Sequence, residues 1–231
     1  MAKLVTELVG TFFLVLVIAL VSAAPGPMGP LAIGSILMVM VYMGGHVSGA
    51  HYNPAVTLGV LLRKAMPAAE AAGYWAAQLM GAVLAAFSAW AIVGHTFAPG
   101  PAPGAVPIPA LLVEVFFTAA LVLVVLDVAG TRATEGNSYF GLAIGFTVLA
   151  GAIAGGGISG GAFNPAVGLG PMIVHALAGY PQALANAWLY VVGPGVGAVL
   201  AVIIYRAQHP APRRGETRPL GHPDTPGPTA P

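Results

Sequence analysis

The chain carries the polar dipeptide Asn-Pro twice, each time in very apolar surroundings. The stretch SGAHYNPAVTLG covers residues 48–59 and SGGAFNPAVGLG covers residues 159–170, and eight of the twelve aligned positions are identical. An asparagine side chain offers one acceptor oxygen and two N–H donors without a charge. Two such side chains could hydrogen-bond a small neutral molecule, provided that the fold brings them together. The motifs consist of Asn53, Pro54 and Ala55, and of Asn164, Pro165 and Ala166.

Other residue patterns that could support chemistry are few. His46 and His51 are five residues apart, which misses the i, i+4 spacing of a helical metal pair, and no carboxylate accompanies them. The 231 residues contain no cysteine, so disulfides and cysteine-ligated metals are excluded. We find neither a nucleophile–base pair nor a metal-ligand set in the sequence. We therefore expect no enzyme activity, no metal and no cofactor.

The composition indicates an integral membrane protein. The chain is 58% hydrophobic and 6% charged, whereas a soluble domain is about 25% charged. Its net charge is only +1 and the apolar part holds no basic cluster, so we expect lipid and not nucleic acid as a partner. The first apolar run exceeds a signal-peptide core of about 7–15 residues, and five more apolar segments follow it. We interpret it as the first membrane span.

Six segments are long enough to span a bilayer, which takes about 20 apolar residues. They cover residues 4–23, 31–48, 70–94, 110–129, 139–157 and 182–205. Residues 98–109 are uncharged and rich in proline, which predicts a loop. We expect one membrane-embedded domain over 1–206, with repeats at about 1–97 and 110–206, and a disordered, proline-rich tail over 207–231.

The basic residues predict the orientation. All eight Lys and Arg residues fall on the side of the predicted spans that holds both termini. The positive-inside rule makes that side cytoplasmic. These residues are Lys3, Arg63, Lys64, Arg132, Arg206, Arg213, Arg214 and Arg218.

The two halves of the chain form an inverted repeat. With a shift of 111 residues, 14 of 29 positions agree between 31–59 and 142–170. Glu7 is echoed by Glu114. Each half holds three spans, and an odd number means that the halves insert with opposite orientation. Such repeats place a binding or permeation site at the membrane midplane.

A short apolar run follows each Asn-Pro and predicts a half-helix. Asn is a preferred N-cap and Pro a preferred first helical residue. About ten helical residues reach roughly 15 Å, half of the apolar core. Two helix N-termini would then meet at the midplane, with irregular backbone before each asparagine lining a path. Its predicted carbonyls belong to Gly49, Ala50, His51 and Tyr52, and to Gly160, Gly161, Ala162 and Phe163.

Taken together, GHVSGAHYNPAVT, ELVGTFF and the paired Asn-Pro-Ala motifs resemble the aquaporin, or major intrinsic protein, family over about residues 3–206. The resemblance implies an all-α membrane fold of six transmembrane helices and two re-entrant half-helices. It also implies a homotetramer with one pore per subunit. Glu7 and Glu114 would accept hydrogen bonds from loop N–H groups, although a proton-coupling role stays open.

The same resemblance places the outer constriction, or selectivity filter, at Ile33, Ala152, Gly161 and Val167. Water-selective members carry Arg where this chain has Val167, so we do not expect strict selectivity for water. We expect a passive channel for water, small neutral solutes of the glycerol, urea and ammonia class, or both. Ions and protons would be excluded, because two positive helix ends face the path.

Two other functions are compatible with the sequence. A secondary active transporter of a small neutral solute could be built on inverted repeats, but it would need ion ligands at the midplane. A structural membrane protein without conduction would need bulky residues in the lumen. We expect a multi-pass protein of a bacterial or archaeal plasma membrane, with both termini in the cytoplasm.

Overall fold

The computed structural model describes residues 1–101 and 104–210, and within these ranges the chain forms eight α-helices, two 3-10 turns and no strand. The helices are α1 (Ala2–Ala23), α2 (Gly29–Ser48), α3 (Pro54–Leu62), α4 (Ala68–Val93), α5 (Pro107–Val128), α6 (Phe140–Ser159), α7 (Pro165–Leu177) and α8 (Leu189–Gln208). The 3-10 turns are η1 (Arg132–Thr134) and η2 (Pro181–Asn186). Six segments are long and apolar enough to cross a membrane: α1, α2, α4, α5, α6 and the run from η2 through α8.

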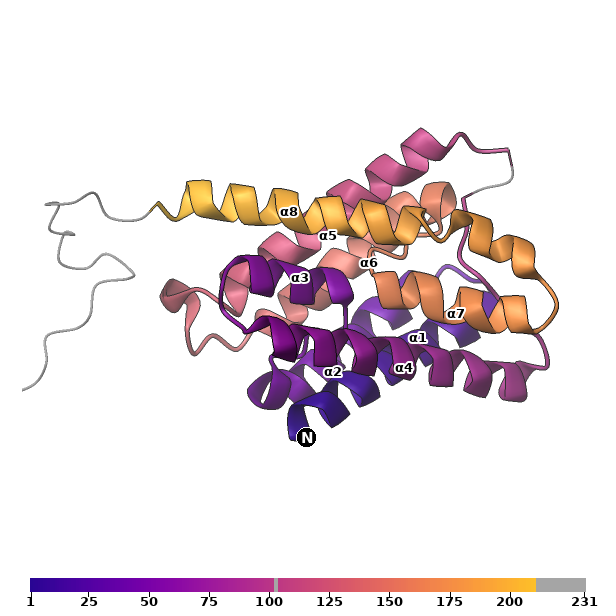
Figure 1. Ribbon diagram of the computed structural model, residues 1–231, viewed down its shortest axis with the longest axis horizontal. Helices are drawn as coiled ribbons and strands as arrows, with labels where there is room; N and C mark the ends of the chain where they lie inside the picture. The colour runs from indigo at the N-terminus through magenta and orange to yellow at the C-terminus, as the bar shows by residue number, and fades with distance from the viewer. Residues whose placement is uncertain (102–103, 211–231) are drawn as a thin grey trace, which may run out of the picture.

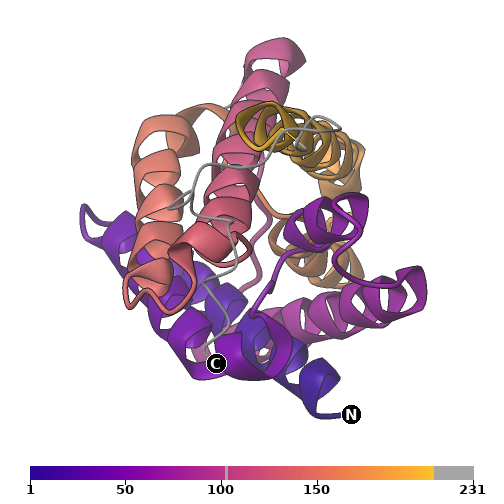
Figure 2. The same ribbon diagram turned by 90° about the vertical axis from the view of Figure 1, so that its left-hand side faces the viewer.

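The two short helices α3 and α7 lie end to end along the bundle (Figure 1). Both pack between α4 and α8. The end-on view shows the long helices side by side around the molecule, with α3 between α4 and α8 (Figure 2). This arrangement matches the predicted fold of six spanning helices and two half-helices.

Glycines allow the close contacts between two long helices within each half of the chain, α1 with α4 and α5 with α8. A Cβ at Gly197 of α8 would lie 2.6 Å from the carbonyl oxygen of Val115 in α5. Gly81 of α4 packs in the same way on the carbonyl of Leu8 in α1. Small residues permit such backbone approach in membrane bundles, where packing drives association. The α1–α4 and α5–α8 pairs are therefore equivalent parts of the two halves.

The boundaries differ from the predicted ones by more than two residues in three places. Helix α5 begins at Pro107, inside the predicted loop 98–109, because proline fits the first helical turn. The last predicted span begins as the turn η2 and becomes helical at Leu189, a distinction that apolar content cannot make. It also continues to Gln208, into the predicted tail. The rest of that tail, from residue 211, lies outside the described residues.

Candidate pore

Each asparagine of the repeated motif caps a half-helix. Asn53 has an extended backbone, and its Oδ1 accepts the N–H of Ala55 at 2.8 Å. Asn164 does the same with the N–H groups of Ala166 and Val167, at 2.9 and 3.4 Å. Pro54 and Pro165 occupy the first helical position, where no N–H is needed. The predicted starts of both half-helices are thus observed.

The same asparagines also tie the two halves to each other. Asn53 Nδ2 donates to the carbonyl of Phe163 at 2.9 Å, and Asn164 Nδ2 donates to the carbonyl of Tyr52 at 2.8 Å. We call these two bonds the cross-brace. Each amide still has a second hydrogen, and both asparagines border a cavity. The sequence analysis missed the cross-brace, although the inverted repeat implies that any such bond occurs twice.

The loops before the asparagines take up left-handed backbone conformations. The φ angle is 51° at Ala50, 48° at Tyr52 and 50° at Phe163. Non-glycine residues adopt this region at a cost of about 1–2 kcal/mol each. Such loops turn successive N–H groups toward one side. A buried acceptor on that side must compensate for the strain.

Glu7 supplies the acceptor in the first half. Its Oε1 accepts from Ser48 Oγ at 2.7 Å and from the N–H of His51 at 3.0 Å. Its Oε2 accepts from the N–H of Tyr52 at 2.7 Å and from Gln78 Nε2 at 2.8 Å. Four donors fill the capacity of one carboxylate, so this side chain is committed to holding the loop.

Glu114 supplies the acceptor in the second half. Its Oε1 accepts from Ser159 Oγ at 2.8 Å and from the N–H of Ala162 at 3.0 Å, and its Oε2 accepts from the N–H of Phe163 at 2.7 Å. Glu7 and Glu114 are fully buried, and neither borders the two large cavities described below. The geometry agrees with the loop-holding role and offers nothing toward proton coupling.

Two tyrosines complete the loop supports and were not foreseen. Tyr74 Oη donates to the carbonyl of Ser48 at 2.8 Å, and Tyr190 Oη donates to the carbonyl of Ser159. A usable signal existed in the sequence. Each tyrosine lies seven residues before one copy of the repeated stretch GAVLA, which begins at Gly81 and at Gly197.

Two cavities lie on either side of the cross-brace. Cavity 1, of about 600 Å³, is bordered by Asn53 and Asn164 and by the connections that follow α1 and α4. All four predicted filter residues border it: Ile33, Ala152, Gly161 and Val167. Cavity 2, of about 620 Å³, lies at the opposite end and is bordered by Arg63, Arg132 and Glu135. The structure therefore brings the predicted filter and the asparagine pair to one space.

The loop residues predicted to supply pore carbonyls divide between these cavities. Gly49 borders cavity 2, and His51 borders both cavities. Phe163 borders neither cavity, and its carbonyl accepts the Asn53 amide of the cross-brace. The others border cavity 1: Ala50, Tyr52, Gly160, Gly161 and Ala162.

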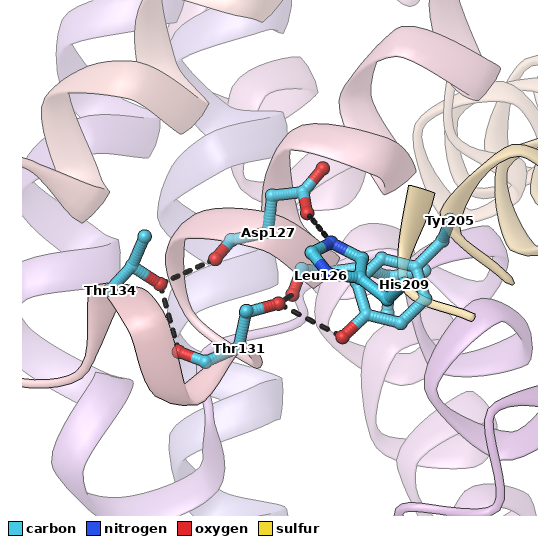
Figure 3. A network of polar contacts seen from close by, with 6 residues as sticks. All are labelled: Leu126, Asp127, Thr131, Thr134, Tyr205 and His209. Carbon is cyan, nitrogen blue, oxygen red and sulfur yellow. Dashed lines mark hydrogen bonds and ion pairs between the residues drawn. The ribbon is translucent and has the colours of Figure 1, made fainter. Parts of the chain in front are cut away.

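A polar network beside cavity 2 connects the end of α8 to the end of α5 (Figure 3). Thr131 Oγ1 lies 2.9 Å from Tyr205 Oη and 3.0 Å from the carbonyl oxygen of Leu126. His209 Nε2 lies 2.8 Å from Asp127 Oδ1. Asp127 is partly exposed and links α5 to the residue after α8.

The chain matches the family model described as Major intrinsic protein over residues 1–205. It belongs to the major intrinsic protein family. It is 35% identical to "Aquaporin NIP1-1" of Oryza sativa subsp. japonica over 88% of this chain and 72% of the relative. It is 36% identical to "Glycerol uptake facilitator protein-like 6" of Lactiplantibacillus plantarum, over 89% and 97% of the two chains.

A solved structure has the same fold. The aquaglyceroporin from Plasmodium falciparum superposes with a TM-score of 0.80 at 23% identity, covering 88% of this chain and 94% of that one. The predictions of the family and of the all-α fold are confirmed. The protein is a multi-pass membrane channel for water or small solutes and not an enzyme.

Proposed function

We propose that this channel conducts water and small neutral solutes of the glycerol, urea and ammonia class passively, and that it excludes ions and protons. The observation that carries the proposal is the meeting of two helix N-termini at the cross-brace, with a cavity on each side. Each helix end carries about half a positive charge. A cation at the junction meets two such ends, whereas a neutral molecule can accept a hydrogen bond from either asparagine.

The four proposed filter residues set the size and polarity of the solute. Ile33, Ala152, Gly161 and Val167 offer neither bulk nor a fixed charge, and Val167 is only 4% exposed. A glycerol or urea molecule can place its apolar face against them. Its polar groups can bond the loop carbonyls that border cavity 1. Water passes as well, but meets fewer donors there than it would beside an arginine.

The Val167→Arg variant tests this assignment. Arginine adds five N–H donors and a permanent charge, which narrows the opening and favours single-file water. We expect glycerol and urea flux to fall at least about tenfold more than water flux, a difference of about 1.4 kcal/mol. Stopped-flow osmotic and solute-gradient measurements on proteoliposomes with matched protein content check the ratio. Val167→Leu is the control for size without charge. Equal glycerol-to-water ratios in wild type and Val167→Arg would remove these four residues from the filter.

Ion exclusion is tested separately in planar bilayers. We expect no cation current above the lipid background from the unmodified protein. Replacing Asn53 or Asn164 by Asp places a negative charge at the junction and weakens the barrier to cations. A steady cation current through the unmodified protein, of the size of a true ion channel, contradicts the proposal.

The proposed assembly is a homotetramer in a bacterial or archaeal plasma membrane, with residues 1–206 as the channel domain and both termini cytoplasmic. The orientation rests on the positive-inside rule. Two contacts support the placement of the basic residues at one end of the helix bundle. Arg206 Nη2 donates to the carbonyl of Leu62, next to Arg63, and Lys3 pairs with Glu70 at the start of α4. Native mass measurement in mild detergent tests the tetramer. Protease accessibility of the residue 211–231 tail in sealed vesicles tests the orientation.

A further inference from the structure

His51 is the polar side chain placed where the two cavities meet. Of the residues that border these cavities, His51 and Val125 are the two that border both. The His51 ring packs edge-on against Tyr74, with centroids 5.1 Å apart. Its Nδ1 lies 3.0 Å from Thr57 Oγ1, while Nε2 has no hydrogen-bond partner among residues 1–101 and 104–210. What the ring offers a permeant therefore depends on which nitrogen carries the hydrogen.

Gln78 fixes one bond of Thr57. Gln78 and Thr57 are fully buried. Gln78 Nε2 donates both to Glu7 Oε2 at 2.8 Å and to Thr57 Oγ1 at 3.0 Å. The amide cannot be turned around, because its oxygen would then face a carboxylate oxygen. The Thr57 oxygen is thus an acceptor toward Gln78 and has one hydrogen of its own to give.

That hydrogen has two possible acceptors. The carbonyl oxygen of Asn53 lies 3.2 Å from Thr57 Oγ1 and already accepts the Thr57 backbone N–H at 3.0 Å. A hydroxyl–carbonyl bond ordinarily measures about 2.5–3.0 Å. The ring nitrogen of His51 is closer, at 3.0 Å, and has no other hydrogen-bond partner within residues 1–101 and 104–210. On these distances we assign the hydroxyl hydrogen to His51 Nδ1, in preference to the longer bond to the Asn53 carbonyl.

We propose that Gln78 and Thr57 act as positioning residues that hold neutral His51 with its hydrogen on Nε2, as an N–H donor at the junction of the cavities. The inference rests on the proposed pore function. It adds a third donor to the free amide hydrogens of Asn53 and Asn164. The second half has no equivalent, because the 111-residue shift pairs His51 with Ala162 and Thr57 with Gly168.

This arrangement defines what a permeant must offer. A molecule leaving the asparagine pair toward cavity 2 loses their donors and meets the Nε2–H of His51. It crosses easily only if it carries an acceptor lone pair, as water, glycerol and urea do. With the hydrogen on Nδ1 instead, the ring would present an acceptor beside loop carbonyls that are also acceptors, and such a permeant would be left without a donor.

Nitrogen NMR of the protein in liposomes tests the position of the hydrogen. The sample is labelled with ¹⁵N-histidine, and the His51 signals are identified by their absence in His51→Phe. We expect unmodified His51 to show a bare Nδ1 and a hydrogen-bearing Nε2. A hydrogen on Nδ1 in the unmodified protein overturns the proposal, whether or not any variant folds.

Variants at Thr57 connect the spectrum to transport. Thr57→Val removes the hydroxyl, so His51 should show a mixture of both forms and water flux per protein should fall about two- to tenfold. Thr57→Ser keeps the hydroxyl and should keep the wild-type spectrum and flux. An unchanged spectrum in Thr57→Val, or an identical loss in both variants, contradicts the positioning role. If the unmodified protein conducts nothing, the pore proposal fails, while the spectrum still decides the form of His51.

Discussion

Glu7 and Glu114 each anchor one re-entrant loop, so their surroundings can be compared contact by contact. Both accept a serine hydroxyl and two successive backbone N–H groups. In both halves the carbonyl of that serine accepts a tyrosine hydroxyl, and the asparagine that ends the loop bonds the opposite loop. The shared contacts all concern the path of the backbone.

The two halves differ in the residues that surround these shared contacts. Glu7 has a fourth donor in Gln78, whereas the position aligned with it by the GAVLA repeat is Pro194, which has no side-chain donor. Thr11 Oγ1 donates to the carbonyl of Glu7 at 2.7 Å, but Thr118 Oγ1 is buried and unpaired within the described part of the chain. Gln78 Oε1, in turn, is buried and unpaired within the same part of the chain, so each half keeps one such atom. The difference that remains is the fourth donor of Glu7.

The residues that hold the loops in place differ in their symmetry from the residues that meet the permeant. Residues that hold the loops occur twice. Asn53 and Asn164 also occur twice, and they both cap a half-helix and border the path. His51 and its support Thr57 occur once, because the sequence repeat aligns them with Ala162 and Gly168. A duplicated fold can thus keep its scaffold symmetric while each half contributes different groups to the permeant.

We expect the largest effect on stability when each buried glutamate is replaced by glutamine. In Glu7→Gln the new NH₂ group must point at two donors whichever way the amide is turned, for example the Tyr52 N–H and the Gln78 amide. In Glu114→Gln the NH₂ group can be turned to the side where it meets only the N–H of Phe163. At about 1–3 kcal/mol for each opposed donor, we expect losses of about 2–6 and 1–3 kcal/mol in the free energy of unfolding. Denaturant titration in detergent measures both. Glu70→Gln, in a partly exposed ion pair, is the control. A greater loss in Glu114→Gln would contradict the idea that the fourth donor makes Glu7 the more sensitive of the two acids.

Removing either bond of the cross-brace should lower the free energy of unfolding by a similar amount. Asn53→Ala and Asn164→Ala each remove one helix cap and one bond to the other loop, for an expected loss of about 1–3 kcal/mol. The double variant should lose less than the sum, because both bonds close the same junction. The same titration with all three variants measures this coupling. Additive losses would mean that the two bonds act independently.

The smallest effects are expected at the ion pairs that join helix ends in each half. Lys3 pairs with Glu70 between α1 and α4, and Asp127 pairs with His209 at the ends of α5 and α8. Both pairs are partly exposed, so Lys3→Ala and His209→Ala should each change the free energy of unfolding by no more than about 1 kcal/mol. Thr131→Val, which removes a buried hydroxyl bonded to Tyr205, serves as the contrasting variant with a larger loss. A loss from His209→Ala that exceeds it would make the exposed pair the main attachment of α8.

The sequence allowed the local part of this structure to be predicted. Asn-Pro marks a helix start through contacts within three residues, and the repeat pointed to Glu7 and Glu114 as equivalent supports. The cross-brace joins residues 110 and 112 positions apart, so no local pattern contains it. The same limit applies to Phe163, whose backbone was expected along the path. Its carbonyl accepts the Asn53 amide, as the Tyr52 carbonyl accepts the Asn164 amide, through contacts that only the fold creates.

The cross-brace also constrains the order in which the protein can mature. Asn53 finds its partner carbonyl at Phe163, 110 residues further along the chain. At about 5–20 residues per second, the ribosome needs roughly 5–20 s to make that stretch. During this interval the first loop has its anchor, Glu7, but not its partner. The nascent first half must therefore remain in the insertion machinery or the lipid with the Asn53 amide unpaired. The cross-brace can form only after the second loop and α7 have entered the membrane from the opposite side.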